Sequence, residues 1–148
     1  MSLIGIFILK GNDMRKLYSL IISMTLVSFA MTANAGEFGT LRTEMSAARE
    51  SLISLMLHAD QRGPADQKKV KETADAVSAH LSKLTAPAGK EAQFKELVET
   101  WKAFKETREK ELVPAILKGN EAKAKEIAGG VQKERITKCQ SLISELGD

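Results

Sequence analysis

Residues 38–60 read FGTLRTEMSAARESLISLMLHAD, and apolar side chains recur in this stretch every three or four positions. The spacing alternates between three and four over three heptads, at Phe38, Leu41, Met45, Ala48, Leu52, Leu55 and Ala59. This pattern is typical of a helix that packs one face against other helices. The stretch therefore predicts a long amphipathic helix, and the additional apolar residues near its end predict burial on more than one flank.

Glycine and proline divide the rest of the chain into three further helical segments. The breaks fall at Gly63-Pro64, at Pro87 with Gly89, and at Gly119-Asn120. They predict helices over residues 65–85, 90–118 and 120–146. The apolar face of the last segment is predicted to contain Ala124, Ile127, Ala128, Val131, Cys139, Leu142, Ile143 and Leu146. Because no stretch alternates as a strand does, we expect an all-α fold, an antiparallel up-down-up-down four-helix bundle.

Three residues carry local expectations about these helices. Pro64 suits the first turn of the second helix, because its missing N–H has no partner there in any case. Asn120 is a good N-cap for the fourth helix. Pro114 lies late in the third helix, where it removes a backbone donor, and it predicts a kink.

The N-terminal region predicts an export signal. Met14-Arg15-Lys16 is a basic start, residues 17–33 are almost wholly apolar, and Ala33-Asn34-Ala35 ends the region with the small residues that a signal peptidase reads. We expect translation to begin at Met14, cleavage after Ala35, a mature domain over residues 36–148 and a periplasmic location. An uncleaved membrane anchor is the alternative, because seventeen residues is at the short limit for a span.

Charge and composition exclude several classes of function. Removing Lys10, Arg15, Lys16 and Asp13 leaves 19 basic and 18 acidic residues in the mature chain, interleaved along the helices. This distribution predicts no nucleic-acid surface. No nucleophile–base arrangement or phosphate-binding loop occurs, so we expect no enzymatic activity. His58 and His80 are predicted to lie far apart, which argues against a metal site.

Arginine positions give the clearest functional signal. Arg108 occupies an apolar seam position, Arg135 has a similar place on the fourth helix, and Arg42 and Arg49 share one face of the first helix. Burying an arginine at an apolar seam position costs free energy unless its charge is paired or reaches water. One interpretation is an ion pair with a neighbouring glutamate or extension of the side chain to solvent. The other is an anion site, since converging guanidinium groups would bind a small organic acid.

Two further features each have a structural and a functional interpretation. Gly129-Gly130 interrupts the fourth helix, and the pair indicates either a local bend or a notch that leaves room for a ligand. Trp101 and Phe104 form an aromatic step on the third helix. They indicate either core filling or the wall of a pocket.

The second half of the mature chain resembles the periplasmic four-helix-bundle sensor domain of methyl-accepting chemotaxis receptors. The resemblance is carried by W-x2-F-x3-R-x3-L from Trp101 to Leu112, and by PAILKGNEAKA over residues 114–124. Residues 52–60 are similar to the first helix of that family. The resemblance implies a chemoreceptor-like sensory domain that binds small molecules between helices, usually as a homodimer. It implies that Arg108 contacts the ligand, with Arg49 and Arg135 as weaker candidates.

The chain departs from that family because it ends at Asp148, with no second membrane span and no signalling region. We therefore expect a stand-alone periplasmic module without a cofactor, which binds a small organic anion through Arg108, Arg135, Arg49 and Trp101. Two alternatives stay open. One is a haem-binding bundle similar to the b-type cytochromes, with Met45 and Cys139 as ligands. The other is a chaperone-like module that binds a periplasmic protein partner through its outer face.

Overall fold

The computed structural model describes residues 36–147, and this part of the chain contains helices and no strand. The predicted all-α class is confirmed for these residues. The predictions for the start at Met14, the apolar stretch and cleavage after Ala35 lie outside the described residues. Within residues 36–147, no helix is both long and apolar enough to span a membrane.

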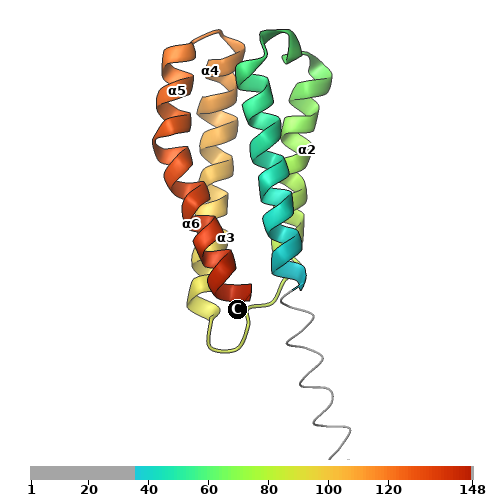
Figure 1. Ribbon diagram of the computed structural model, residues 1–148, viewed down its shortest axis with the longest axis vertical. Helices are drawn as coiled ribbons and strands as arrows, with labels where there is room; N and C mark the ends of the chain where they lie inside the picture. The colour runs from blue at the N-terminus through green and yellow to red at the C-terminus, as the bar shows by residue number, and fades with distance from the viewer. Residues whose placement is uncertain (1–35, 148) are drawn as a thin grey trace, which may run out of the picture. The chain divides into compact units, whose positions relative to one another are not determined.

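The helices follow the predicted punctuation (Figure 1). The first covers residues 36–57 and is called helix 36–57 below. It is followed by η1 (Ala59–Gln61), α2 (Pro64–Leu81), α3 (Glu91–Thr107), η2 (Arg108–Leu112), α4 (Val113–Leu117), α5 (Glu121–Gly129) and α6 (Val131–Gly147). The segments α3, η2 and α4 continue one another along one rod, as do α5 and α6, so the arrangement is bundle-like (Figure 1).

Helix 36–57 buries the predicted seam, with one exception. Its six seam residues from Phe38 to Leu55 are all buried. Ala59, which was predicted to continue the seam, is exposed in η1, because the helix has already ended at residue 57. Arg62 stabilises this early end by donating to the carbonyl oxygens of Leu55 and Met56, both 3.1 Å away. These are carbonyls of the last turn, which have no partner within the helix.

The predicted helix starts are confirmed by their local geometry. Pro64 occupies the first turn of α2. The Asn120 side chain caps α5 by accepting a hydrogen bond from the Lys123 backbone N–H, 3.1 Å away. Gly119 precedes it with a φ of 70°, a left-handed conformation that favours glycine.

The disturbance expected at Pro114 takes the form of a π-helical turn. The segment η2 covers Arg108–Leu112, and the Val113 backbone N–H bonds to the Arg108 carbonyl five residues back. Proline has no N–H to continue the α-helical pattern, and one wide turn before it accommodates the missing donor. The turn begins at the buried Arg108 and ends at the buried Leu112.

The fourth predicted helix is divided at Gly130, and its buried face differs from the prediction. α5 ends at Gly129 and α6 begins at Val131. Val131, predicted to be on the apolar face, is 36% exposed, whereas Gln132 and Ile136 are buried. The difference is confined to residues 131–136, because the chain does not continue as one regular helix through Gly130. Further along α6, the predicted residues Cys139, Leu142, Ile143 and Leu146 are all buried.

A polar layer separates two apolar clusters in the interior. The larger cluster lies toward the chain ends of the described region and includes Phe38, Trp101 and Leu146. The smaller cluster contains Leu52, Leu55, Val70, Leu112, Ala115, Ile116, Ala124 and Ile127. The buried polar residues of residues 36–147 are Ser51, Arg108 and Gln132. In sequence, each of the three lies between a member of the larger cluster and a member of the smaller one, so the polar side chains occupy the junction between the clusters.

Candidate functional site

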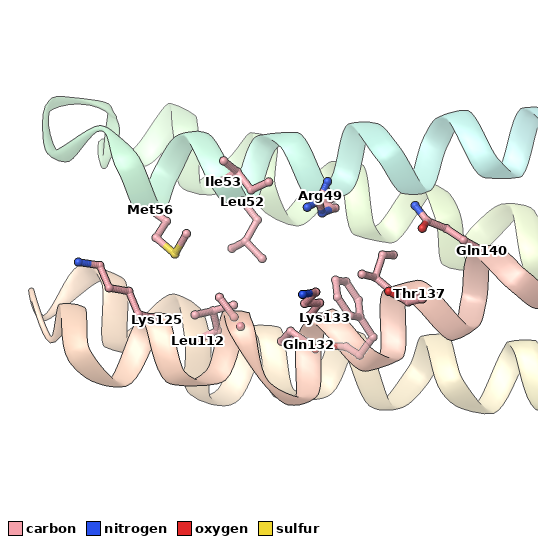
Figure 2. Close-up of a pocket in the computed structure, with 14 residues that line it drawn as sticks. Arg49, Leu52, Ile53, Met56, Leu112, Lys125, Gln132, Lys133, Thr137 and Gln140 are labelled. Atoms are coloured by element: carbon pink, nitrogen blue, oxygen red, sulfur yellow. Dashed lines mark hydrogen bonds between the residues drawn. The ribbon is translucent and has the colours of Figure 1, made fainter.

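A pocket of about 510 Å³ opens between helix 36–57 and the α5–α6 rod. Figure 2 shows side chains of the two rods facing each other across it. The volume is within the range typical of small-molecule sites. The pocket is lined by Arg49, Leu52, Ile53, Met56, Phe104, Leu112, Lys125, Ala128, Gly129, Gln132, Lys133, Ile136, Thr137 and Gln140.

Two irregularities of the helices shape this pocket. Leu112, the last residue of the π-helical turn, and Phe104, one helical turn before it begins, contribute to the lining of the pocket. On the facing rod, Ala128 and Gly129 lie at the break between α5 and α6. A Cβ atom added at Gly129 would meet nothing within 4 Å. The sequence Ala-Gly therefore leaves open space where larger side chains would project.

The charged residues of the pocket are all cations. Arg49, Lys125 and Lys133 line it, and no aspartate or glutamate does. Arg49 and Lys133 are exposed and have no carboxylate within 4 Å among residues 36–147, whereas Lys125 pairs weakly with Glu121 at 3.8 Å. The whole chain has 22 lysines and arginines and 19 aspartates and glutamates, so the uniformly positive charge of the pocket lining does not follow from the composition of the chain.

Gln132 is the buried polar residue of the lining. Its side chain is 3% exposed, and its Nε2 donates to the Phe104 carbonyl oxygen at 3.0 Å. Its Oε1 is closed off from solvent and has no hydrogen-bond partner among the described residues. The wall of the pocket thus contains an enclosed acceptor without a donor.

Arg108 is buried at the predicted seam position, and neither of the two sequence interpretations describes its contacts. Its Nη1 donates to the Ala48 carbonyl oxygen at 3.0 Å, and its Nη2 donates to the Val70 carbonyl and to Ser51 Oγ. Burial lowers the pKa of the guanidinium to about 10, although the charges of Glu109 and Asp75 oppose this shift, so it remains charged at neutral pH. Arg108 does not line the pocket.

The four predicted ligand contacts are not brought together. Arg135 donates to the Ala103 carbonyl at 3.0 Å and to Thr107 Oγ1 at 2.6 Å. Trp101 is buried and donates from Nε1 to Ser78 Oγ at 3.0 Å. Its ring stacks on Phe104, with centroids 5.2 Å apart, and Phe104 in turn lines the pocket. Arg49 is the one member of the four that lines the pocket directly.

The haem ligands of the alternative interpretation lie elsewhere. Met45 and Cys139 are both buried in the larger apolar cluster. Neither lines the pocket or a smaller hollow of about 190 Å³ beside it. Burial raises the pKa of the Cys139 thiol to about 12, against a weak opposing effect of Lys138. The thiol is therefore neutral at physiological pH, which is the poorer form for binding a metal.

The two histidines occupy different environments. His80 lies between two carboxylates of helix 36–57, with Nδ1 2.8 Å from Glu44 Oε2 and Nε2 2.8 Å from Glu37 Oε2. His58 is exposed. In the part of the chain that the structure describes, no cluster of three metal-ligating side chains was found.

Sequence reasoning missed Lys125, Gln132 and Lys133 as pocket residues. A signal for Gln132 was present, because it lies four residues before Ile136 and seven before Cys139, on the seam of α6. A glutamine among apolar seam positions breaks the pattern as an arginine does. The two lysines carried no such signal, since lysines are frequent along every helix.

Comparisons with protein-family models, with curated proteins and with solved structures gave no match for this chain. None of them identifies a chemoreceptor sensor domain.

Proposed function

We propose that this protein binds a small organic anion with an apolar body in the pocket between helix 36–57 and α5–α6, without catalysing a reaction. One observation carries the proposal: an apolar pocket of about 510 Å³ has three cations and no carboxylate in its lining. Leu52, Ile53 and Met56 face the occupant from one side (Figure 2). Ile136 and Leu112 add apolar surface on the other.

The two kinds of lining contribute differently to binding. Each buried methylene of a ligand contributes about 0.8 kcal/mol, so the apolar wall supplies most of the affinity. Arg49 and Lys133 are exposed, and contacts with exposed charges contribute about 1 kcal/mol or less and are screened by salt. The cations therefore select the sign of the ligand, and binding is expected to weaken as the salt concentration rises.

The proposal includes an antiparallel up-down-up-down order of the four rods. Two contacts between helix 36–57 and α2 support it. Glu37, at the start of the first helix, contacts His80 near the end of α2, while Ser51, further along, bonds to Thr73 at 2.9 Å. Contacts that advance along one helix and retreat along the other are those of antiparallel neighbours.

The wider setting of the proposal comes from the sequence. The export signal predicts that the mature domain meets its ligand in the periplasm, and the chemoreceptor-like pattern predicts a sensory role and a homodimer. The resemblance to that family implies that Arg108 contacts the ligand. We instead propose Arg49 and Lys133 for this role, because both line the pocket and Arg108 is bonded to helix carbonyls.

Binding of octanoate tests the proposal. Octylamine and octanol, which have the same chain length, are the probes with the opposite charge and with no charge. Trp101, the single tryptophan, stacks on the pocket residue Phe104, so its fluorescence reports occupancy. The paired variant Arg49→Gln with Lys133→Gln is expected to weaken octanoate binding about tenfold at low salt. The matched control is Arg42→Gln with Lys138→Gln, which removes the same charge from the same two helices outside the pocket.

A site selective for anions would be contradicted if octanol bound as tightly as octanoate. It would also be contradicted if the two paired variants lost the same affinity for octanoate. An absence of binding by all three probes would favour the chaperone-like module that binds a protein partner.

One observation supports that second function: Leu57 is 66% exposed and lines the smaller hollow at the end of the first helix, with Ile116 and Met56. A partner segment that fills this hollow would remove the exposed Leu57 side chain from water.

A further inference from the structure

The three cations of the pocket lie in two different places along it. Arg49 and Lys133 face each other across the pocket, whereas Lys125 lies toward the other end, on the side of Met56 (Figure 2). Met56 and Lys125 also line the smaller hollow of about 190 Å³, so both lie where the pocket meets that hollow. The positive charge of the lining is therefore divided between two ends of the pocket.

The stretch between these two ends is apolar. Leu52 and Ile53 line it from helix 36–57, and Leu112 lines it from η2 (Figure 2). Arg49 and Met56 mark its two ends on helix 36–57 and are seven positions apart, which corresponds to two helical turns, or about 10 Å along the axis. The pocket thus combines an apolar span with a positive charge at each end.

Lys125 is free to take a partner from the pocket side. Its Nζ lies 3.8 Å from Glu121 Oε2, which is too long for a hydrogen bond, and the two side chains are 74% and 71% exposed. A pair with this geometry and exposure contributes little. Glu121 lines the smaller hollow and not the pocket, so no carboxylate of the pocket lining faces Lys125.

We propose that the ligand is a chain with a carboxylate at each end, which spans the pocket from Arg49 and Lys133 to Lys125. This inference rests on the proposed function and narrows its ligand class to α,ω-dicarboxylates of intermediate length. The first carboxylate lies between Arg49 and Lys133. The methylene chain lies along Leu52 and Ile53, and the second carboxylate accepts a hydrogen bond from Lys125.

The physical consequence is a dependence on chain length that differs between monocarboxylates and dicarboxylates. A monocarboxylate gains affinity with each methylene that it buries. A dicarboxylate that is too short holds its second carboxylate against the apolar stretch, which is costly because the charge has no partner there. A dicarboxylate of matching length places that carboxylate at Lys125, which is exposed, so the charge is both paired and hydrated.

The test compares hexanedioate, octanedioate and decanedioate with the monocarboxylates of the same carbon number, at low salt and with Trp101 fluorescence as the readout. Hexanedioate is expected to bind about tenfold more weakly than hexanoate. Decanedioate is expected to bind at least as tightly as decanoate, because its second carboxylate reaches Lys125. The order of the two ligand classes therefore reverses as the chain lengthens.

A variant of Lys125 identifies the second contact. Lys125→Gln is expected to weaken decanedioate binding about threefold, since the lost partner is exposed, and to leave octanoate binding unchanged. Lys123→Gln is the matched control. It removes the same charge from an exposed position of α5 that lines neither the pocket nor the smaller hollow.

The outcomes separate this inference from the proposed function. If octanoate binds through Arg49 and Lys133 but decanedioate binds more weakly than decanoate, the inference is wrong and the proposed function stands. If Lys125→Gln weakens decanedioate binding no more than Lys123→Gln does, the second carboxylate lies elsewhere, and the inference is again wrong. If none of these anions binds, both are wrong.

Discussion

Arg108 Nη1 donates to the carbonyl oxygen of Ala48, 3.0 Å away on helix 36–57. Through Nη2 the same guanidinium reaches the Val70 carbonyl on α2, so one side chain from η2 joins three segments of the chain. The Ala48 carbonyl also accepts the Ser51 hydroxyl at 2.9 Å. Both carbonyls lie within helices, where the backbone N–H four residues later is the regular donor to each. Arg108 is 1% exposed and has no carboxylate within 4 Å among the described residues.

We predict that Arg108 contributes to stability mainly through its volume. Arg108→Ala would leave a cavity between the two apolar clusters and lower the free energy of unfolding by about 3 kcal/mol. Arg108→Met fills most of that space, removes an enclosed charge and leaves the two carbonyls with their backbone N–H donors within the helices. Its cost in the free energy of unfolding is therefore expected to stay below about 1 kcal/mol. Urea unfolding of each variant against the wild type measures these two changes in the free energy of unfolding.

The two Arg108 variants also separate packing from ligand binding. Octanoate affinity is expected to change less than about threefold in Arg108→Met, because Arg108 does not line the pocket. If methionine destabilises the protein as much as alanine does, the hydrogen bonds to Ala48 and Val70, rather than the filled volume, hold the segments together.

His80 gives a pH dependence whose sign follows from its neighbours. Burial lowers its pKa, but the hydrogen bonds to Glu44 and Glu37 outweigh this effect and raise the pKa above its ordinary value near 6.5. The folded protein then binds more protons at this site than the unfolded chain does. The contribution of His80 to the free energy of unfolding is fully present below about pH 6.5. It is lost as the pH rises through the raised pKa of His80 in the folded state.

The measurement is the Tm of the wild type and of His80→Gln between about pH 5.5 and pH 8.5. We expect the wild type to lose a few degrees relative to His80→Gln across this range. His58→Gln is the control, since His58 is exposed and outside this contact. A His80→Gln variant with the same pH profile as the wild type would show that the two glutamates do not stabilise the imidazolium.

The sequence predicted the helices well because the information is local. The seam from Phe38 to Leu55 and the breaks at Gly63 and Gly119 depend on residues a few positions apart. The prediction failed at the end of this helix, because apolar spacing alone does not specify where a helix stops. Ala59 is exposed because the chain leaves the helix at residue 58, and Arg62 returns to bond the last carbonyls.

The site was less predictable than the fold. Arg49 was predicted and lines the pocket, and the notch interpretation of Gly129 agrees with its place in the lining. Arg108 and Arg135 are predicted as ligand contacts from their seam positions, but they bond to carbonyls of other segments, and those carbonyls carry no sequence signal. Which groups share a pocket depends on packing between segments far apart in the chain, and periodicity within one helix does not encode it.

Gly129 and Gly130 are adjacent, yet we predict that alanine has opposite effects at the two positions. A Cβ at Gly129 meets nothing within 4 Å, so Gly129→Ala is expected to stabilise the protein by up to about 1 kcal/mol through helix propensity. A Cβ at Gly130 would lie 3.0 Å from the Glu126 carbonyl oxygen. Because this contact involves backbone, Gly130→Ala is expected to destabilise by about 1 kcal/mol or more.

Chemical denaturation of the two glycine variants, each against the wild type, tests this difference. Equal effects would show that the break between α5 and α6 does not depend on Gly130. Gly129→Ala also adds a methyl group at the pocket lining, so its octanoate affinity should be measured alongside its stability.

Cys139 is expected to report opening of the α6 side of the core. It is the single cysteine of the chain and is fully buried, and burial raises the pKa of its thiol to about 12. Because the thiolate is the reactive form, the folded protein should react with a disulfide reagent at least a hundredfold more slowly than the unfolded chain near pH 8. Reaction in the native state then requires α6 to separate from α3, along which it packs.

Ile136→Ala, one turn before Cys139 and buried in the same cluster, should speed this reaction, whereas Lys138→Gln on the exposed side should not. Rapid reaction of the wild type under native conditions would mean that this part of the core is not closed.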